Sequence, residues 1–559
     1  MKKLIECVPN FSEGRDESII RQITDAIKAT EGVSLLDVDP GATTNRMVVT
    51  FVGRPEAAVE AAFRGIKKAT ELIDMRKQKG AHPRMGATDV CPFIPVSNVN
   101  WEEAIECANK LGKRVGEELG IPVYLYEKAA KDKSRSNLAV IRAGEYEGFA
   151  EKIKKPEWKP DFGPAKIDKA GATAIGAREF LVAYNVNLNT KSVRRANSVA
   201  FDVREQGRFK TEDGTPTGKK VLDEKGEPIR EPGMLKHVKA IGWFVKEYGI
   251  AQVSMNLTNI DETPLHVAFD ACVESAIKRG LRVTGSEIVG MVPKKSLVDA
   301  GRYFLRKQKW SEGASEEELI DIAVRSMGLS ELKPFDPKEK VIELKIESDS
   351  KSLVKMNLRE YCNETLSDSP APGGGSVAAL MGALGASLGG MVANLSAGKR
   401  GWDDKLEYFS DWAVKAQKLK DELLFLVDED TNAFNKVMDS FGLPKGSDDE
   451  KKARAAAIES ATKYAAEIPL KVMETSAKSY ELLAEMADKG NPASVSDVGV
   501  GAGATRACID GAALNVRINL AQLKDEKFKS ELSKKVERLK AESESQFKKI
   551  DQIVQSKIA

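Results

Sequence analysis

One histidine in the first half of the sequence has neighbours that suit acid–base chemistry. His82 lies in the run KGAHPRMGATDVCPFIPV, residues 79–96, between Gly80 and Gly86 and just before a predicted strand. Loops at strand ends are where rigid scaffolds place catalytic groups. A neutral imidazole there can accept one proton and return another near neutral pH. By spacing alone, the same histidine could equally do no more than hydrogen-bond its own loop.

Two other strand-to-turn segments could supply polar side chains to the same cleft. Residues 6–14 read ECVPNFSEG and residues 35–46 read LLDVDPGATTNR, each a predicted strand that runs into a polar turn containing glycine. Asn10, Asp39 and Arg46 could therefore face a shared cleft.

Three arginines are candidate clamps for substrate carboxylates, a role that rests on the family resemblance described below. They are Arg46, Arg84 and Arg178. A guanidinium suits this task because its planar fork of N–H donors matches a carboxylate bidentately. Each of the three could equally be an ordinary surface residue.

The second half contains a glycine-rich turn that runs into a predicted helix. Residues 368–380 read DSPAPGGGSVAAL. The free backbone N–H groups at such a helix start can receive an anion. The segment lacks the GK[ST] ending of a phosphate-binding loop, so a nucleotide is not indicated. The residues expected at this anion site are Gly373, Gly374, Gly375 and Ser376.

A cluster of acids lies within an apolar helical pattern further along. Residues 425–438 read FLVDEDTNAFNKVM, with Asp428, Glu429 and Asp430 in succession. Asp428 and Asp430 are two residues apart, so they point to different faces of a helix. An acid turned toward the interior would have a raised pKa suited to proton transfer, whereas the alternative is a solvated acidic face. Asp497, in the turn KGNPASVSDVGVGA, is expected to cap a helix or bind a ligand.

The elements that must position these residues differ between the two halves. The first half alternates strands and helices in the order βαββαβ and then repeats a similar pattern, which predicts two split-βαβ sheets with helices on one face. Two such sheets would pack face to face or line a cleft. The first predicted unit has strands at 4–8, 33–38, 47–52, 88–96 and 122–126, and helices at 17–29, 55–75 and 102–119. The second has strands at 180–188, 237–245, 251–257 and 281–292, and helices at 193–204, 265–279 and 294–307.

Two stretches are expected to connect elements. The second half of the chain is expected to be helical. Residues 206–232 read as an exposed hairpin or loop, and 331–351 as a charged connection with a possible strand at 341–346. The span 376–396 has no charge and is long enough to cross a membrane, but its Gly, Ala and Ser content favours a buried helix. The predicted helices of the second half are 376–396, 403–437, 448–487, 498–523 and 525–558.

The composition excludes several classes of protein. At 559 residues the chain is too long for one core. Its 86 basic and 84 acidic residues give no sign of nucleic-acid binding. With six cysteines in no CxxC pair and three histidines, neither a zinc site nor a disulfide framework is expected. The amino terminus lacks an apolar signal segment, so we expect a cytoplasmic protein with reduced thiols.

Long runs of the sequence resemble the formiminotransferase-cyclodeaminase family. ECVPNFSEG, DVDPGATTNRMVVTFVG and PVYLYEKAA resemble its formiminotransferase N-subdomain, and DFGPAKIDKAGATAIGAREFLVAYNVNL its folate-contacting segment. VREQGR, KAIGWF and EIVGMVP continue the match through residue 330. APGGGSVAA, LVDEDTNAF, IPLKV, GNPASVSDVGVGA and ALNVRINL resemble the cyclodeaminase/cyclohydrolase helical family across residues 356–524.

This resemblance implies an architecture and a set of residue roles. The fold would be two ferredoxin-like α/β subdomains with facing sheets, followed by an all-α bundle. The domains would be an N-subdomain (1–177), a C-subdomain (178–330), a linker (331–353) and a cyclodeaminase/cyclohydrolase-like domain (354–559). His82 and Asp430 match the family's catalytic residues, with Asp39 as our candidate partner. The substrate- and folate-binding candidates are Asn10, Arg46, Arg84, Gly163, Pro164, Gly171, Arg178, Gly373, Gly374, Gly375, Ser376 and Asp497.

The implied function is bifunctional. The first half would transfer the formimino group of N-formimino-L-glutamate to tetrahydrofolate, and the second would cyclise the product to 5,10-methenyl-tetrahydrofolate and release ammonia, in histidine degradation. Tetrahydrofolate, polyglutamylated, would be the co-substrate, with no metal, and the chain would form a homo-oligomer built on dimers. Two alternatives stay open: a formyltransferase or methenyl-folate cyclohydrolase on the same architecture, because formimino and formyl differ only by NH versus O, and a non-catalytic folate-binding scaffold.

Overall fold

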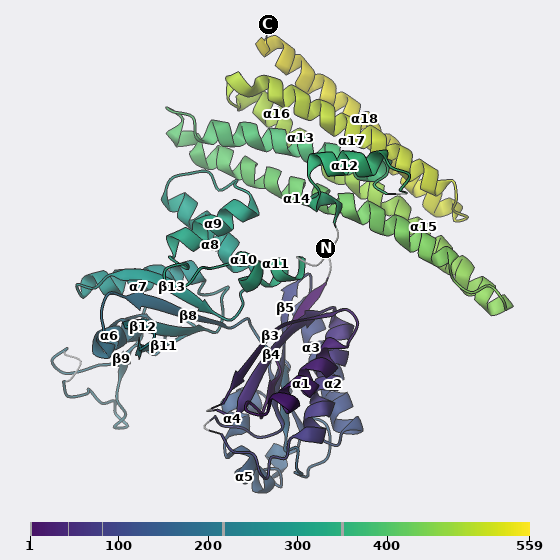
Figure 1. Ribbon diagram of the computed structural model, residues 1–559. Helices are drawn as coiled ribbons and strands as arrows, with labels where there is room; N and C mark the ends of the chain where they lie inside the picture. The colour runs from purple at the N-terminus through teal and green to yellow at the C-terminus, as the bar shows by residue number, and fades with distance from the viewer. Residues whose placement is uncertain are drawn as a thin grey trace. The chain divides into compact units, whose positions relative to one another are not determined.

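The computed structural model describes residues 3–42, 44–80, 82–214, 218–347, 352–369 and 371–558 (Figure 1). The chain divides into two compact units. The first unit contains Met1–Leu297 and Met327–Asp349, and the second contains Val298–Ser326 and Ser350–Ala559.

The first unit begins with a mixed sheet that has helices packed on one face. Its strand order is β3-β4-β1/β2-β5-β7-β6, with β1 and β2 both between β4 and β5. Alternate residues of these strands, such as Cys7, Phe51 and Phe93, pack with α1, α2 and α3 in one apolar core. The strands are β1 (Leu4–Cys7), β2 (Asn10–Phe11), β3 (Val33–Gly41), β4 (Arg46–Gly53), β5 (Thr88–Ser97), β6 (Val123–Glu127) and β7 (Thr173–Ala177); the helices are α1 (Glu17–Lys28), α2 (Pro55–Leu72) and α3 (Trp101–Glu118).

The opposite face of this sheet is covered only in part by helices of the same segment. Residues of α4 (Leu138–Arg142) and α5 (Glu145–Lys152) form a second apolar cluster with β5, β6 and β7. The segment containing β3, β4 and β2 contributes polar side chains to this face. The register pairs Glu6 with Val52 and Asn10 with Val48, so both polar residues share the face on which Arg46 lies.

A second sheet of the first unit repeats the same topology. Its strands are antiparallel in the order β11-β12-β8-β13, which is the order β3-β4-β1-β5 of the first sheet, so the predicted split-βαβ repeat is confirmed. That the sheets face each other stays a prediction. The strands are β8 (Val182–Leu188), β11 (Val238–Val245), β12 (Ile250–Leu257) and β13 (Val283–Val289), the helices α6 (Val193–Val203) and α7 (Leu265–Lys278), and β9 (Arg208–Phe209) and β10 (Arg230–Glu231) pair within the predicted hairpin.

Two details of the first unit differ from the sequence prediction. The strand β7 was not predicted, although it is the inner parallel neighbour of both β5 and β6. The predicted strand at 341–346 is wrong, because α11 (Ile342–Glu347) is a helix. The short helix α10 (Pro337–Lys340) precedes α11, and adjacent Val341 and Ile342 are both fully buried, which the period-2 alternation of a half-buried strand does not produce.

The second unit is all-α, as predicted, and α13 is its central helix. Glycines let neighbouring helices approach α13 closely: a Cβ on Gly382 would lie 2.8 Å from Cys508 Sγ, and one on Gly385 would lie 2.5 Å from Thr505 Oγ1. The predicted helix 448–487 is two helices that meet at Lys478. The helices are α12 (Leu358–Leu366), α13 (Gly374–Ala397), α14 (Leu406–Phe441), α15 (Asp448–Ala477), α16 (Ser479–Lys489), α17 (Val495–Leu520) and α18 (Glu526–Ile558).

Helix α13 is also the candidate membrane segment of the described chain. By length and composition it could cross a membrane, with mean hydropathy 1.6, but 61% of that window is buried inside the structure. This burial agrees with the packed interior helix predicted for residues 376–396.

Residues 298–326, which contain most of α8 (Lys294–Lys307) and all of α9 (Glu316–Ser326), belong to the helical unit. Asn394 and Gln417 donate hydrogen bonds to the carbonyl of Gly313, each 3.0 Å long. The predicted boundaries at 177, 330 and 353 stay predictions, and residues 348–351 of the predicted linker lie outside the described residues.

Candidate active sites

His82 has the geometry of a neutral general base. Its Nδ1 lies 2.7 Å from the carbonyl oxygen of Pro83. A carbonyl only accepts hydrogen bonds, so Nδ1 carries the proton and Nε2 keeps its lone pair. Partial burial and the positive charges of Arg46 and Arg142 lower the pKa of the imidazole below its ordinary 6.5. The ring is therefore neutral at pH 7.

The charged group that organises this site is Asp89, which the sequence analysis missed. Asn10 pairs with Val90 and Phe11 with Thr88, so Asp89 is the extra residue of a β-bulge in β5. Its fully buried carboxylate accepts hydrogen bonds from Arg46 Nη1 at 2.5 Å, Arg142 Nη2 at 2.6 Å and the Met85 backbone N–H at 3.0 Å. An acid inside the apolar strand TDVCPFIPV is the signal that could have identified it.

Two predicted residues, Asn10 and Arg46, lie together beside His82. Arg46 Nη2 and Nε donate to Asn10 Oδ1 at 2.8 and 3.1 Å, while Asn10 Nδ2 donates to the Val8 carbonyl at 2.8 Å. With Asp89, these contacts use three of the five N–H donors of Arg46. Two donors remain for a substrate.

The structure does not place Asp39 beside His82. Asp39 is exposed on β3, where it pairs with Val48, and Val48 in turn pairs with Asn10 on β2. Strand β4 thus separates Asp39 from Asn10, and Arg46 lies on β4 two residues from Val48. Among the described contacts, none joins Asp39 to the imidazole, whose carboxylate neighbour is Asp89.

Arg84 and Arg178 have different surroundings from those expected of substrate clamps. Arg84 is buried, and its guanidinium donates to Glu145, Glu147 and Gln78, so it ties α5 to the His82 loop. Arg178 donates to the Glu179 carbonyl at 2.9 Å and lies close to Glu6. Burial raises the pKa of Glu6 to about 7, and Arg178 opposes the shift.

Glu6 is a second residue that the sequence analysis missed. It is buried on the sheet face that carries Asn10 and Arg46. A glutamate inside the apolar strand LIEC was the available signal.

The predicted folate-binding glycines divide between two places. Gly171 has φ +71° and bridges Gly86, and a Cβ there would lie 2.2 Å from the Met85 carbonyl oxygen, so it belongs to the His82 loop. Gly163, at φ +82°, packs against Ile121 near the end of α3 instead. Pro164 is exposed next to it.

In the helical unit, Asp430 lies against the first turn of α13. Ser376 Oγ donates to Asp430 Oδ2 at 3.1 Å, and a Cβ on Gly375 would lie 2.2 Å from Oδ1. Only glycine therefore leaves room for the carboxylate at this position. Burial raises the pKa of Asp430 above its ordinary 3.8, while the hydrogen bonds from Ser376 oppose that shift. The Asp430 carboxylate thus lies at the helix start where an anion site is predicted.

Of the three consecutive acids, Asp430 is the one that faces the glycine-rich turn. Asp428 accepts hydrogen bonds from Ser352 Oγ and from the Leu353 backbone N–H, the latter at 2.6 Å. Glu429 accepts a hydrogen bond from the Tyr464 hydroxyl. The predicted separation of Asp428 and Asp430 onto different faces is confirmed.

Asp497 does not join this site. Helices α13 and α17 pack antiparallel, with Gly374 near Asn515 and Gly385 near Thr505. Asp497 is in the first turn of α17, eighteen residues from Asn515, which is roughly 27 Å along the helix axis. Asn515 is instead the α17 residue at the glycine-rich turn.

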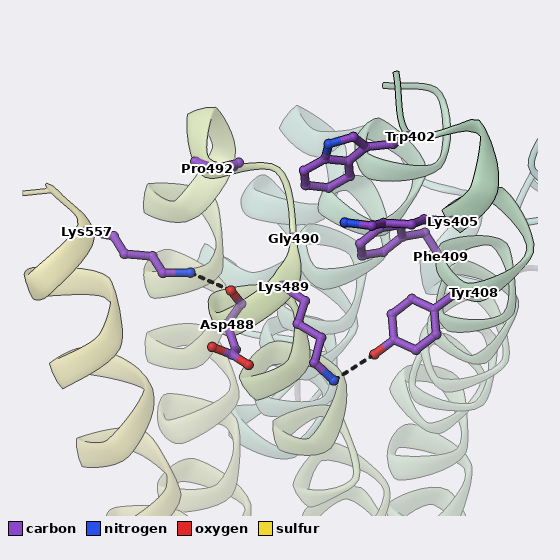
Figure 2. Close-up of a pocket in the computed structure, with 9 residues that line it drawn as sticks. All are labelled: Trp402, Lys405, Tyr408, Phe409, Asp488, Lys489, Gly490, Pro492 and Lys557. Carbon is purple, nitrogen blue, oxygen red and sulfur yellow. Dashed lines mark hydrogen bonds between the residues drawn. The ribbon is translucent and has the colours of Figure 1, made fainter. Parts of the chain in front are cut away.

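A cavity of the helical unit lies at the other end of α13. It has a volume of about 490 Å³ and is lined by Trp402, Lys405, Tyr408, Phe409, Asp488, Lys489, Gly490, Pro492 and Lys557. Figure 2 shows Lys489 reaching toward the Tyr408 hydroxyl, at 3.4 Å, and Lys557 toward the Asp488 backbone. None of the predicted site residues lines it. Within the described part of the chain, no group of three or more His, Cys, Asp or Glu side chains could hold a metal ion.

Comparison with known families accounts for nearly the whole chain. Residues 4–178 match the model of the formiminotransferase domain, N-terminal subdomain, residues 183–347 that of the formiminotransferase domain, and residues 357–538 that of formiminotransferase-cyclodeaminase. Formimidoyltransferase-cyclodeaminase of Gallus gallus is 44% identical over 547 residues, which cover 97% of each chain. The chain belongs to the formimidoyltransferase-cyclodeaminase family.

Smaller relatives of this formimidoyltransferase-cyclodeaminase family member match its parts. Glutamate formimidoyltransferase of Thermoplasma acidophilum is 45% identical over 322 residues, which are 57% of this chain and 98% of that protein. Methenyltetrahydrofolate cyclohydrolase of Methylorubrum extorquens is 38% identical over 201 residues, which are 36% of this chain and 97% of that protein. The family resemblance inferred from the motifs is confirmed.

Proposed function

We propose that this chain is a bifunctional enzyme of histidine degradation. It transfers the formimino group of N-formimino-L-glutamate to tetrahydrofolate and then cyclises 5-formimino-tetrahydrofolate to 5,10-methenyl-tetrahydrofolate. The observation that carries this proposal is identity of 44% along 97% of a bifunctional relative, across both candidate sites.

In the transfer step, His82 acts as a single base and acid. The folate N5 attacks the formimino carbon and forms a tetrahedral adduct. Nε2 of His82 takes the proton that N5 loses and then delivers it to the nitrogen of glutamate, whose bond to carbon breaks. The lowered pKa of the imidazole supports this role, because the base is free at neutral pH. Arg46 and Arg142 flank the ring and would favour a carboxylate substrate.

In the cyclisation step, Asp430 moves a proton between two nitrogens of one molecule. Folate N10 attacks the formimino carbon, and Asp430 accepts the N10 proton. The carboxylic acid then protonates the amino group on the same carbon, the C–N bond breaks, and ammonia leaves. A carboxyl with a raised pKa can both accept the N10 proton and return it to the leaving nitrogen. The reacting atoms are already tethered, so positioning supplies much of the rate.

A methenyl-folate cyclohydrolase is the second candidate for the helical unit, favoured by the match to the Methylorubrum extorquens protein along 97% of its length. The test is purified protein with N-formimino-L-glutamate and tetrahydrofolate, followed for ammonia and methenyl absorbance. Ammonia release that depends on both substrates supports the bifunctional proposal. Turnover of N-formyl-glutamate would favour the formyltransferase alternative, and hydrolysis of methenyl-tetrahydrofolate without ammonia release would favour the cyclohydrolase alternative. A protein that shows none of these activities would favour a binding scaffold.

Several finer features belong to the same proposal. Polyglutamylated tetrahydrofolate is the co-substrate, and neither reaction requires a metal. The protein works in the cytoplasm, without nucleic acid or membrane. Balanced charge and an α13 buried mostly within the bundle support the last point.

We also propose a homo-oligomer built through the helical unit. Helices α13 and α17 pack on each other and each leaves apolar side chains in solvent at helical spacing. These are Leu384, Met391, Leu395, Val500, Leu514 and Ile518, of which Leu514 is 65% exposed. Such an unpaired apolar surface marks a protein–protein interface more often than a free monomer face.

A further inference from the structure

Helix α12 is held to the helical unit by a single buried side chain. Tyr361 is 9% exposed and belongs to the apolar core, whereas Leu358 and Leu366 of the same helix are 83% and 85% exposed. A nine-residue helix usually buries a stripe of residues. In α12 the packing of the Tyr361 ring in the apolar core therefore sets the position of the helix.

The hydroxyl of Tyr361 is buried without a hydrogen-bond partner among the described residues. Leaving a buried polar group unpaired costs stability. Other buried tyrosines avoid this cost: the Tyr480 hydroxyl lies 2.7 Å from Ser543 Oγ, and the Tyr124 hydroxyl donates to the Trp158 carbonyl at 2.5 Å. The unpaired phenol of Tyr361 therefore requires an explanation.

The charged neighbours of this phenol are the acids of the candidate cyclodeaminase site. Burial raises the pKa of Tyr361 to about 12, with Asp430 and Asp428 adding to the shift. The phenol thus stays protonated and is a donor at neutral pH. The Asp428 carboxylate already accepts hydrogen bonds from residues 352 and 353, and the Asp430 carboxylate accepts one from Ser376. The phenolic O–H therefore has no acceptor among the described residues and is left to donate to a ligand bound at Asp430.

We propose that Tyr361 is a positioning residue that donates its phenolic O–H to the folate bound at Asp430. This inference rests on the proposed cyclodeaminase function. The acceptor is the carbonyl oxygen of the pteridine ring, which neighbours N5 and is the acceptor nearest the formimino group. A hydrogen bond there holds the ring so that N10 can reach the formimino carbon. Tyr361 itself makes and breaks no covalent bond.

The test is Tyr361→Phe in the full-length protein, supplied with 5-formimino-tetrahydrofolate. Loss of one hydrogen bond to substrate predicts a KM about five- to tenfold higher, with a smaller change in kcat. Thermal unfolding without folate distinguishes this role from packing. Phe keeps the ring and removes an unpaired hydroxyl, so Tm should stay unchanged or rise.

Tyr480→Phe is the matched control, because its hydroxyl already has a partner in the same bundle. That variant should lower Tm and leave the KM for 5-formimino-tetrahydrofolate unchanged. A Tyr361→Phe protein with wild-type KM, or one with lowered Tm and unchanged kinetics, would overturn the proposal. If the wild-type protein releases no ammonia from 5-formimino-tetrahydrofolate, the cyclodeaminase function itself fails, which is a separate outcome.

Discussion

At the scale of single residues, the two sites use protonation in opposite ways. The imidazole of His82 has a lowered pKa because of burial and nearby guanidinium groups, and the carboxyl of Asp430 has a raised pKa because of burial. Each shift favours the uncharged form of its group, which is the free base for His82 and the carboxylic acid for Asp430.

His82→Ala should abolish formimino transfer and leave the second activity intact. Removal of a general acid–base group typically costs about 10²–10⁴-fold in rate. Transfer is measured from N-formimino-L-glutamate, and cyclisation from supplied 5-formimino-tetrahydrofolate. Transfer near the wild-type rate would mean that His82 only holds its loop.

The transferase should keep its activity to unusually low pH. Because the pKa of His82 is lowered from 6.5, the neutral base persists below that pH and is lost only as the pH falls through the lowered value. The acid limb of the kcat/KM profile for transfer should therefore lie below pH 6.5. An acid limb above pH 6.5 would contradict the arrangement of Arg46 and Arg142 around the ring.

Asp430→Asn should stop ammonia release, let the formimino adduct accumulate, and stabilise the protein at neutral pH. The pKa of Asp430 in the folded protein is raised above 3.8, so ionisation of this carboxyl destabilises the fold. That destabilisation is absent below the pKa of the unfolded chain and grows as the pH rises through the folded pKa. The gain in Tm should thus be present at pH 7 and vanish near pH 3.8. Normal ammonia release from this variant would move the catalytic role to another acid.

At the scale of elements, one glycine decides whether α13 and α14 can form the second site. A Cβ on Gly375 would overlap the Asp430 carboxylate at 2.2 Å, whereas a Cβ on neighbouring Gly374 would make an ordinary 3.4 Å contact with Asn515. Gly375→Ala should therefore displace the carboxylate and lower cyclodeaminase activity by about 10²-fold. Gly374→Ala is the control and should retain activity. Equal activities of the two variants would refute this geometry.

At the scale of the whole molecule, we expect the apolar surface of α13 and α17 to join subunits. Leu384→Glu with Leu514→Glu places charge on that surface, so light scattering should report a smaller mass than for the wild type. Leu222→Glu, which alters an equally exposed leucine in the 206–232 hairpin, should keep the wild-type mass. A wild-type protein that is monomeric at micromolar concentration would rule out the interface.

Much of this molecule follows from local sequence pattern. The βαββαβ order, the all-α second half and the helix start at the glycine-rich turn were predicted from periodicity and turn residues, because these signals act over a few neighbouring residues. Family resemblance supplied the roles of His82 and Asp430. In the structure His82 lies near Arg46 and Arg142, and Asp430 accepts a hydrogen bond from Ser376, while their catalytic roles stay predictions.

Only the tertiary structure decided which polar groups meet. Asp39 and Asp89 are both acids on strands, but strand register places Val48 between Asp39 and Asn10, while a bulge turns Asp89 toward Arg46 and Arg142. Helix direction likewise separates Asp497 from Asp430 and brings Asn515 near the glycine-rich turn. Register and packing direction depend on contacts between residues far apart in sequence, so local sequence patterns do not reveal them.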